Sequence, residues 1–109
     1  MKPVIFSVAK DFSPNPGPRY ARQGANSGES LRRRLLTLLS SNKGKVLIDL
    51  DGTKGIGSSF LDEAFGGLVR WEHMSKNELL DRFEFRSKID PSYVAEIRES
   101  ISRAEPVAE

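Results

Sequence analysis

Apolar and polar side chains alternate with a period of two in residues 4–8 and 83–86, which predicts two short strands. Residues 45–50 predict a third strand between them in the sequence. The middle one carries three consecutive apolar residues, which favours a central strand covered on both faces. Residues 19–22 predict a further short strand, which would return beside the first strand and form an N-terminal hairpin.

Between these segments, apolar residues recur at the spacing of amphipathic helices. Ser27 is the expected N-cap of the first helix, which runs to about residue 40. A second helix follows the capping pattern of Ser59 and Asp62, and Ser75 opens a short third helix. Asp90, which precedes a proline, caps the last one. The expected core positions are Leu31, Leu35, Leu38 and Leu39; Phe60, Leu61, Ala64, Phe65, Leu68 and Val69; Leu79 and Leu80; Val94, Ile97, Ile101 and Ala104.

Helices that alternate with strands indicate an α/β fold, with a mixed, mostly parallel sheet, an N-terminal hairpin and about four helices. A length of 109 residues fits one domain over residues 1–109, and residues 105–109 are expected to be a frayed tail.

The amino-acid composition excludes several kinds of functional site. The chain has no Cys and one His, which excludes disulfides, thiolate nucleophiles and the common zinc sites. We therefore expect no metal and no cofactor. No apolar run is long enough to cross a membrane, so the expected location is the cytoplasm.

Charge is divided unevenly along the chain. Residues 1–45 contain nine basic and two acidic residues, whereas residues 46–109 contain eight basic and thirteen acidic residues. The simplest interpretation is two oppositely charged faces of one domain, with Arg32, Arg33 and Arg34 on the solvated face of the first helix. Nucleic-acid binding is not expected, because no aromatic residues are interleaved with these arginines.

Asp49–Leu50–Asp51–Gly52–Thr53 resembles the first motif of the haloacid-dehalogenase-like phosphotransferases. That resemblance would make Asp49 a nucleophile and Asp51 a general acid in a Mg²⁺-dependent phosphatase. It covers five residues, Lys54 stands where the family has an apolar residue, and no later acidic pair completes the site. A second alternative is phosphate or nucleotide binding by the backbone N–H groups of this glycine-rich loop.

Three other segments of the chain give a different resemblance. Gly17–Pro18–Arg19–Tyr20, Ser27–Gly28–Glu29 and residues 57–68 (GSSFLDEAFGGL) together resemble STAS-like domains of unassigned function, which are related to the STAS domains of anti-sigma-factor antagonists. The resemblance extends over nearly the whole chain. It implies a non-enzymatic regulatory domain that binds a bacterial signalling protein, such as a histidine-kinase-type ATPase.

In STAS antagonists the partner kinase phosphorylates a serine that corresponds to Ser58, and phosphorylation breaks the complex. Here Gly57 replaces the preceding aspartate, and Phe60 replaces the glycine after the serine pair. The candidate interaction or anion-binding residues are Asp51, Gly52, Thr53, Gly55, Gly57, Ser58, Ser59, Phe60, Asp62 and Glu63, with Arg19 and Lys54 as anion-binding helpers. The identity of the partner and the oligomeric state stay open.

Overall fold

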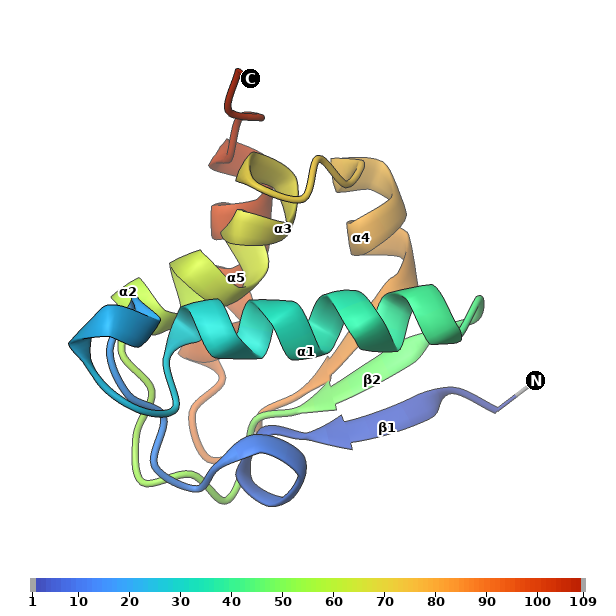
Figure 1. Cartoon of the computed structure of the whole chain (residues 1–109). Coiled ribbons are helices and arrows are strands. Elements are labelled where there is room, and N and C mark those ends of the chain that lie inside the picture. The colour runs from blue at the N-terminus through green and yellow to red at the C-terminus, as the bar shows by residue number, and fades with distance from the viewer. Residues whose placement is uncertain (1, 109) are drawn as a thin grey trace.

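A three-stranded parallel sheet forms one layer of the computed structural model, which describes residues 2–108 (Figure 1). The strands are β1 (Val4–Ser7), β2 (Val46–Asp49) and β3 (Phe83–Arg86), and they are arranged in that order. Every strand pair in the described chain is parallel, so the fold is α/β as predicted, but the sheet is not mixed.

Helices form the second layer. They are α1 (Gly28–Ser41), α2 (Ser58–Leu61), α3 (Gly67–Arg70), α4 (Lys76–Arg82) and α5 (Ser92–Arg103). A π-helical turn, Asp62–Gly66, joins α2 to α3, so these segments continue one another along a single path. A second π-helical turn, Val8–Phe12, follows β1, and a short 3₁₀ turn covers Ala21–Gln23.

The helices lie on one side of the sheet (Figure 1). Strands in the order β1-β2-β3 with right-handed crossovers place both crossovers on the same face. Val46 and Ile48 of β2 are therefore fully buried, whereas Leu47 and Asp49 on the other face are partly exposed. The prediction that this strand is covered on both faces is wrong for the described residues.

The apolar faces of the predicted helices form the core. All six apolar residues expected on the second helix are at most 1% exposed, and Phe65 contacts the rings of Phe83 and Phe85 on β3. Leu38 and Val94 are only partly buried, and Leu80 is 38% exposed. The 3.6-residue period thus identified the core faces correctly except at their margins.

The predicted N-terminal hairpin is not formed in the described chain. Residues 19–22 do not pair with β1, because the carbonyl oxygens of Pro18 and Arg19 accept hydrogen bonds from the N–H groups of Gly28 and Glu29. The first turn of α1 has free N–H donors that need such partners. The segment therefore caps a helix in place of extending the sheet.

Two of the four predicted helix caps are confirmed, because the hydroxyls of Ser27 and Ser75 accept from the third residue of their helices. Asp90 is not the N-cap of the last helix: α5 begins at Ser92 with Pro91 at the N-cap and no side-chain cap, although the Asp90 carboxylate accepts from the N–H of Ser92. Ser59 does not cap its helix, because α2 begins one residue earlier with Gly57 at the N-cap and no side-chain cap.

The C-terminal segment is irregular after Ala104 but is fastened to the domain. The N–H of Val107 donates to the carbonyl oxygen of Arg70 (2.9 Å), and Lys76 pairs with Glu105 (3.4 Å). Glu109, the last residue of the expected tail, lies outside the described residues. Within residues 2–108, no helix is both long enough and apolar enough to cross a membrane.

Candidate functional site

Three segments that are far apart in the sequence meet beside α2. The N–H of Gly28 lies 2.8 Å from the carbonyl oxygen of Pro18, and the N–H of Glu29 lies 2.9 Å from that of Arg19. Gly28 also packs against α2 so closely that a Cβ there would lie 2.6 Å from the carbonyl oxygen of Phe60. The segments that converge are those that carry the STAS-like resemblance: residues 17–20, 27–29 and 57–68.

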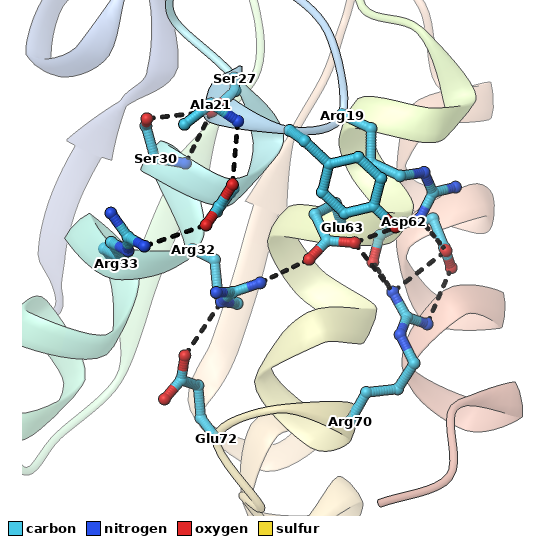
Figure 2. A network of polar contacts seen from close by, with 12 residues as sticks. Arg19, Ala21, Ser27, Ser30, Arg32, Arg33, Asp62, Glu63, Arg70 and Glu72 are labelled. Carbon is cyan, nitrogen blue, oxygen red and sulfur yellow. Dashed lines mark hydrogen bonds and ion pairs between the residues drawn. The ribbon is translucent and has the colours of Figure 1, made fainter. Parts of the chain in front are cut away.

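Their side chains form a group of six charges, which we call the ion-pair cluster (Figure 2). It consists of Arg19, Arg32, Asp62, Glu63, Arg70 and Glu72. Three guanidinium groups face three carboxylates, so the formal charges balance. A balanced and hydrogen-bonded set is the form in which charges can be buried.

Glu63 is the centre of the cluster, with a side chain that is 1% exposed. Arg32 of α1 hydrogen-bonds to one of its carboxylate oxygens and to Glu72 at 2.9 Å (Figure 2). Gly67 leaves the space for Arg32, since a Cβ at Gly67 would lie 2.9 Å from the arginine's Cδ. The absence of a side chain at Gly67 thus allows Arg32 to pack against this helical path.

Asp62 lies at the solvent side of the cluster between two arginines (Figure 2). Arg19 Nη1 is 2.9 Å from the Asp62 carboxylate and 3.3 Å from Glu63. Arg70 Nη2 is 3.1 Å from Asp62 and 3.7 Å from Glu63. Each of these two carboxylates therefore has more than one cationic partner.

Charge pairing in the cluster shifts the pKa values of two residues. Burial tends to raise the pKa of Asp62, but hydrogen bonds and charges from Arg19 and Arg70 outweigh it, and the pKa lies below the ordinary value. The pKa of Arg19 is raised despite desolvation, by hydrogen bonds and charge from Asp62 and Glu63. Both groups are held in their charged forms.

Two predictions about surface residues are wrong. Arg32 is buried by its pairing with Glu63 and Glu72, so it is not on the solvated face of α1. The side chains of Phe60 and Glu63 are each 1% exposed and cannot contact a partner in this conformation. Sequence patterns do not reveal the cluster, because the hydrogen bonds of Arg19 and Arg32 within it join residues that are 31 to 44 positions apart.

An open cavity of about 340 Å³ lies one helical turn before the cluster. Ser58 and Ser59, both exposed, line it from α2, and Glu96 lines it from α5. The Ser58 hydroxyl donates a 2.6 Å hydrogen bond to Glu96 Oε1. The other residues around the cavity are Arg19, Asp62, Glu99, Ser100 and Arg103. The cavity thus brings together the predicted modification site and one predicted anion-binding helper.

The other predicted helper, Lys54, lies in a separate place. It lines a cavity of about 260 Å³ formed by residues 50–55 and the beginning of α5. Two backbone donors of this loop are already used: the N–H of Lys54 donates to Pro14 and that of Ile56 to the Tyr93 hydroxyl. Among the predicted residues, Asp51, Gly52, Thr53 and Gly55 belong to this second cavity.

The two aspartates of the phosphotransferase-like motif are bound by the backbone around them. Asp51 accepts hydrogen bonds from the N–H groups of Lys88 (3.0 Å) and Ile89 (2.9 Å). These bonds lower the pKa of Asp51, whereas a general acid needs a raised pKa. Asp49 accepts from the N–H of Asp51 and faces Arg86 at 3.6 Å.

No candidate metal-binding group of three or more His, Asp or Glu side chains occurs within residues 2–108. The carboxylates of the ion-pair cluster are instead paired with arginines. The carboxylates of the cluster therefore pair with arginines of the same domain.

A family model described as a STAS-like domain of unknown function (DUF4325) matches residues 27–92, more than half of the chain. The chain belongs to this family. Searches of curated proteins and of solved structures found no match. The matched region of this STAS-like domain contains α1, α2 and the acidic residues of the ion-pair cluster, while the loop that supplies Arg19 precedes it.

Proposed function

We propose that this STAS-like domain is a regulatory binding module, and that phosphorylation of Ser58 controls its binding. The partner class is a signalling protein such as a histidine-kinase-type ATPase. The observation that carries the proposal is the position of Ser58: it is exposed in the first turn of α2, with its hydroxyl hydrogen-bonded to Glu96 across an open cavity.

Phosphorylation at Ser58 has a direct electrostatic consequence. The Ser58 Oγ would form a bond to the γ-phosphorus of ATP supplied by the kinase, ADP would leave, and the hydroxyl proton would pass to solvent by way of Glu96. The product carries about −1.5 to −2 charge at neutral pH. It shares the cavity with three acidic residues, Asp62, Glu96 and Glu99, and with two arginines, Arg19 and Arg103.

The new charge alters the surface without unfolding the domain. The Ser58 hydroxyl can no longer donate to Glu96, and two like charges then oppose each other across α2 and α5. A partner that docks over α2 and this cavity would have to bury the new charge, and burying a charge without a partner is costly. Such a partner would therefore dissociate.

The docking surface consists of exposed residues. Gly57, Ser58 and Ser59 are consecutive and exposed, between the buried side chains of Ile56 and Phe60. These two apolar anchors fix the ends of the exposed segment. The segment can therefore present its hydroxyls in a defined position.

The test uses purified bacterial histidine-kinase-type ATPases, each incubated with the domain and ATP. Peptide mass spectrometry should place one phosphoryl group on Ser58. Ser59→Ala is the matched control and should still be modified, whereas Ser58→Ala should not.

Binding of the same ATPases is then measured by calorimetry. The Ser58→Glu variant should bind at least about tenfold more weakly than the native domain, a loss of about 1.4 kcal/mol. Equal binding of native and Ser58→Glu domains, or modification at Ser59 alone, would contradict the proposal.

A further inference from the structure

We propose that Arg19 is the residue that binds the phosphoryl group on Ser58, by moving away from Asp62 and Glu63. This inference rests on the proposed function, since it concerns the phosphorylated state. It identifies a conformational response within the domain, whereas the proposed function concerns the partner.

Helical geometry places Arg19 within reach. Ser58 and Asp62 are four residues apart on one helical path, and such residues have Cβ atoms about 5–6 Å apart. Arg19 Nη1 is 2.9 Å from the Asp62 carboxylate, and Arg19 lines the same cavity as Ser58. A phosphate on Ser58 thus lies beside a guanidinium that is already at the cavity wall.

The cluster can release Arg19 without leaving an isolated carboxylate. Asp62 keeps Arg70 at 3.1 Å. Glu63 keeps its hydrogen bond to Arg32 and has Arg70 at 3.7 Å. Arg32 has no comparable freedom, because it is buried and joins Glu63 to Glu72. Arg19, with 28% of its side chain exposed against 21% for Arg70 and 10% for Arg32, is therefore the most exposed arginine of the group.

A phosphoryl group is a stronger ligand for this guanidinium than a carboxylate. It carries up to two charges and three acceptor oxygens, and arginine can bind it through two parallel hydrogen bonds. The competing cation at the cavity is Arg103, which pairs with Glu99 at 3.1 Å on α5. Arg103 lies on the exposed face of its helix, whereas Arg19 already contacts the path that begins at Ser58.

Movement of Arg19 would reach a second surface. The backbone carbonyl of Arg19 accepts from Glu29 at the first turn of α1, and its guanidinium lies 6.0 Å from the Tyr20 ring. Tyr20 and Trp71 line an open groove of about 440 Å³ on that side. Movement of the Arg19 guanidinium toward Ser58 would thus change its contact with the Tyr20 ring beside this groove.

The test installs phosphoserine at position 58 during protein synthesis, so neither kinase nor partner is needed. Phosphorus NMR then follows the second ionisation of the phosphate in the native background, in Arg19→Gln and in Arg103→Gln. The charged groups facing the phosphate are Arg19, Asp62, Glu96, Glu99 and Arg103. Loss of Arg19 should raise the phosphate pKa by about one unit, and loss of Arg103 should leave it nearly unchanged.

A second measurement needs no substitution at Arg19. The side-chain N–H resonance of Arg19 should shift when phosphoserine replaces Ser58. An unchanged Arg19 resonance, or a phosphate pKa that responds to Arg103→Gln and not to Arg19→Gln, would overturn the inference. Failure of the ATPases to modify Ser58 would instead refute the proposed function and leave this result standing.

Discussion

Two successive turns of one helical path differ in how their charges are compensated. The turn that begins at Asp62 holds balanced charges, with Glu63 almost fully buried among arginines. The turn that begins at Ser58 is exposed, and its hydroxyl donates to Glu96 across an open cavity. Buried and balanced charges serve the fold, whereas an exposed site can accept a new charge.

The comparison also explains the position of the family motif. Its long segment, residues 57–68, covers both turns, so it contains a structural part and an exposed part. Gly66 and Gly67 belong to the structural part, because a Cβ at either would lie 2.9 Å from an arginine of the ion-pair cluster. Substitutions in the structural part should cost more stability than substitutions in the exposed part.

Removing the central carboxylate should cause the largest loss of stability. Glu63→Gln leaves the buried Arg32 and its neighbours with one negative charge too few. Breaking a buried pair by removing one partner costs about 3–5 kcal/mol. Urea unfolding followed by circular dichroism measures the change in the free energy of unfolding.

Two controls accompany that measurement. Arg33→Ala removes the exposed pair with Glu29 and should cost less than about 1 kcal/mol. The double variant Arg32→Met/Glu63→Met should recover part of the loss of stability. In this variant the buried charge of Arg32 is removed together with that of its partner Glu63. A Glu63→Gln domain as stable as the native one would show that the cluster does not hold the fold together.

The contact between α1 and α2 is the next most sensitive point. Gly28→Ala places a Cβ 2.6 Å from the carbonyl oxygen of Phe60, so the backbones must separate. Overpacking of this kind costs about 1–3 kcal/mol. Gly57→Ala is the matched control, since nothing lies within 4 Å of its Cβ and its φ is −78°. Equal stability of the two variants in thermal unfolding would refute the close contact.

The secondary structure could be predicted wherever local spacing alone decided it. The apolar residues of the second helix and the strand Phe83–Arg86 lie where the sequence places them. The hairpin failed for a non-local reason: the carbonyls of Pro18 and Arg19 are used by the N-terminus of α1. No local pattern in residues 19–22 reveals that competition.

The candidate site could be predicted only in outline. The motif located Ser58 and Arg19, but it did not indicate that Glu63 is buried or that Glu96 faces the serine. One available signal was the uneven charge distribution. Arg19 and Arg32 come from the basic first part of the chain, and their partners come from the acidic second part. The excess charges therefore compensate one another inside the fold.

Low pH should weaken the ion pairs of Asp62 on the solvent side of the cluster. The pKa of Asp62 is lowered in the folded state, so the stabilisation is complete above the ordinary aspartate pKa of about 4 and is lost as the pH falls below it. Asp62→Asn should therefore show a smaller decline in unfolding free energy between neutral and acidic pH. A residual decline is expected from Glu29 and Asp51, whose pKa values are also lowered. An unchanged decline would mean that Arg19 and Arg70 do not stabilise the charged form of Asp62.

The smallest effect is expected where the proposed regulation acts, and two serines allow a matched comparison. Ser27 is fully buried and its hydroxyl accepts from the N–H of Ser30, so Ser27→Ala should cost about 0.5–2 kcal/mol. The hydroxyl of Ser58 is exposed, and Glu96 can bond to water once that hydroxyl is removed, so Ser58→Ala should cost less than about 1 kcal/mol. Thermal unfolding of both variants tests this. A larger loss for Ser58→Ala than for Ser27→Ala would assign Ser58 to the structural part of the helix, and its modification would then unfold the domain locally in place of altering a docking surface.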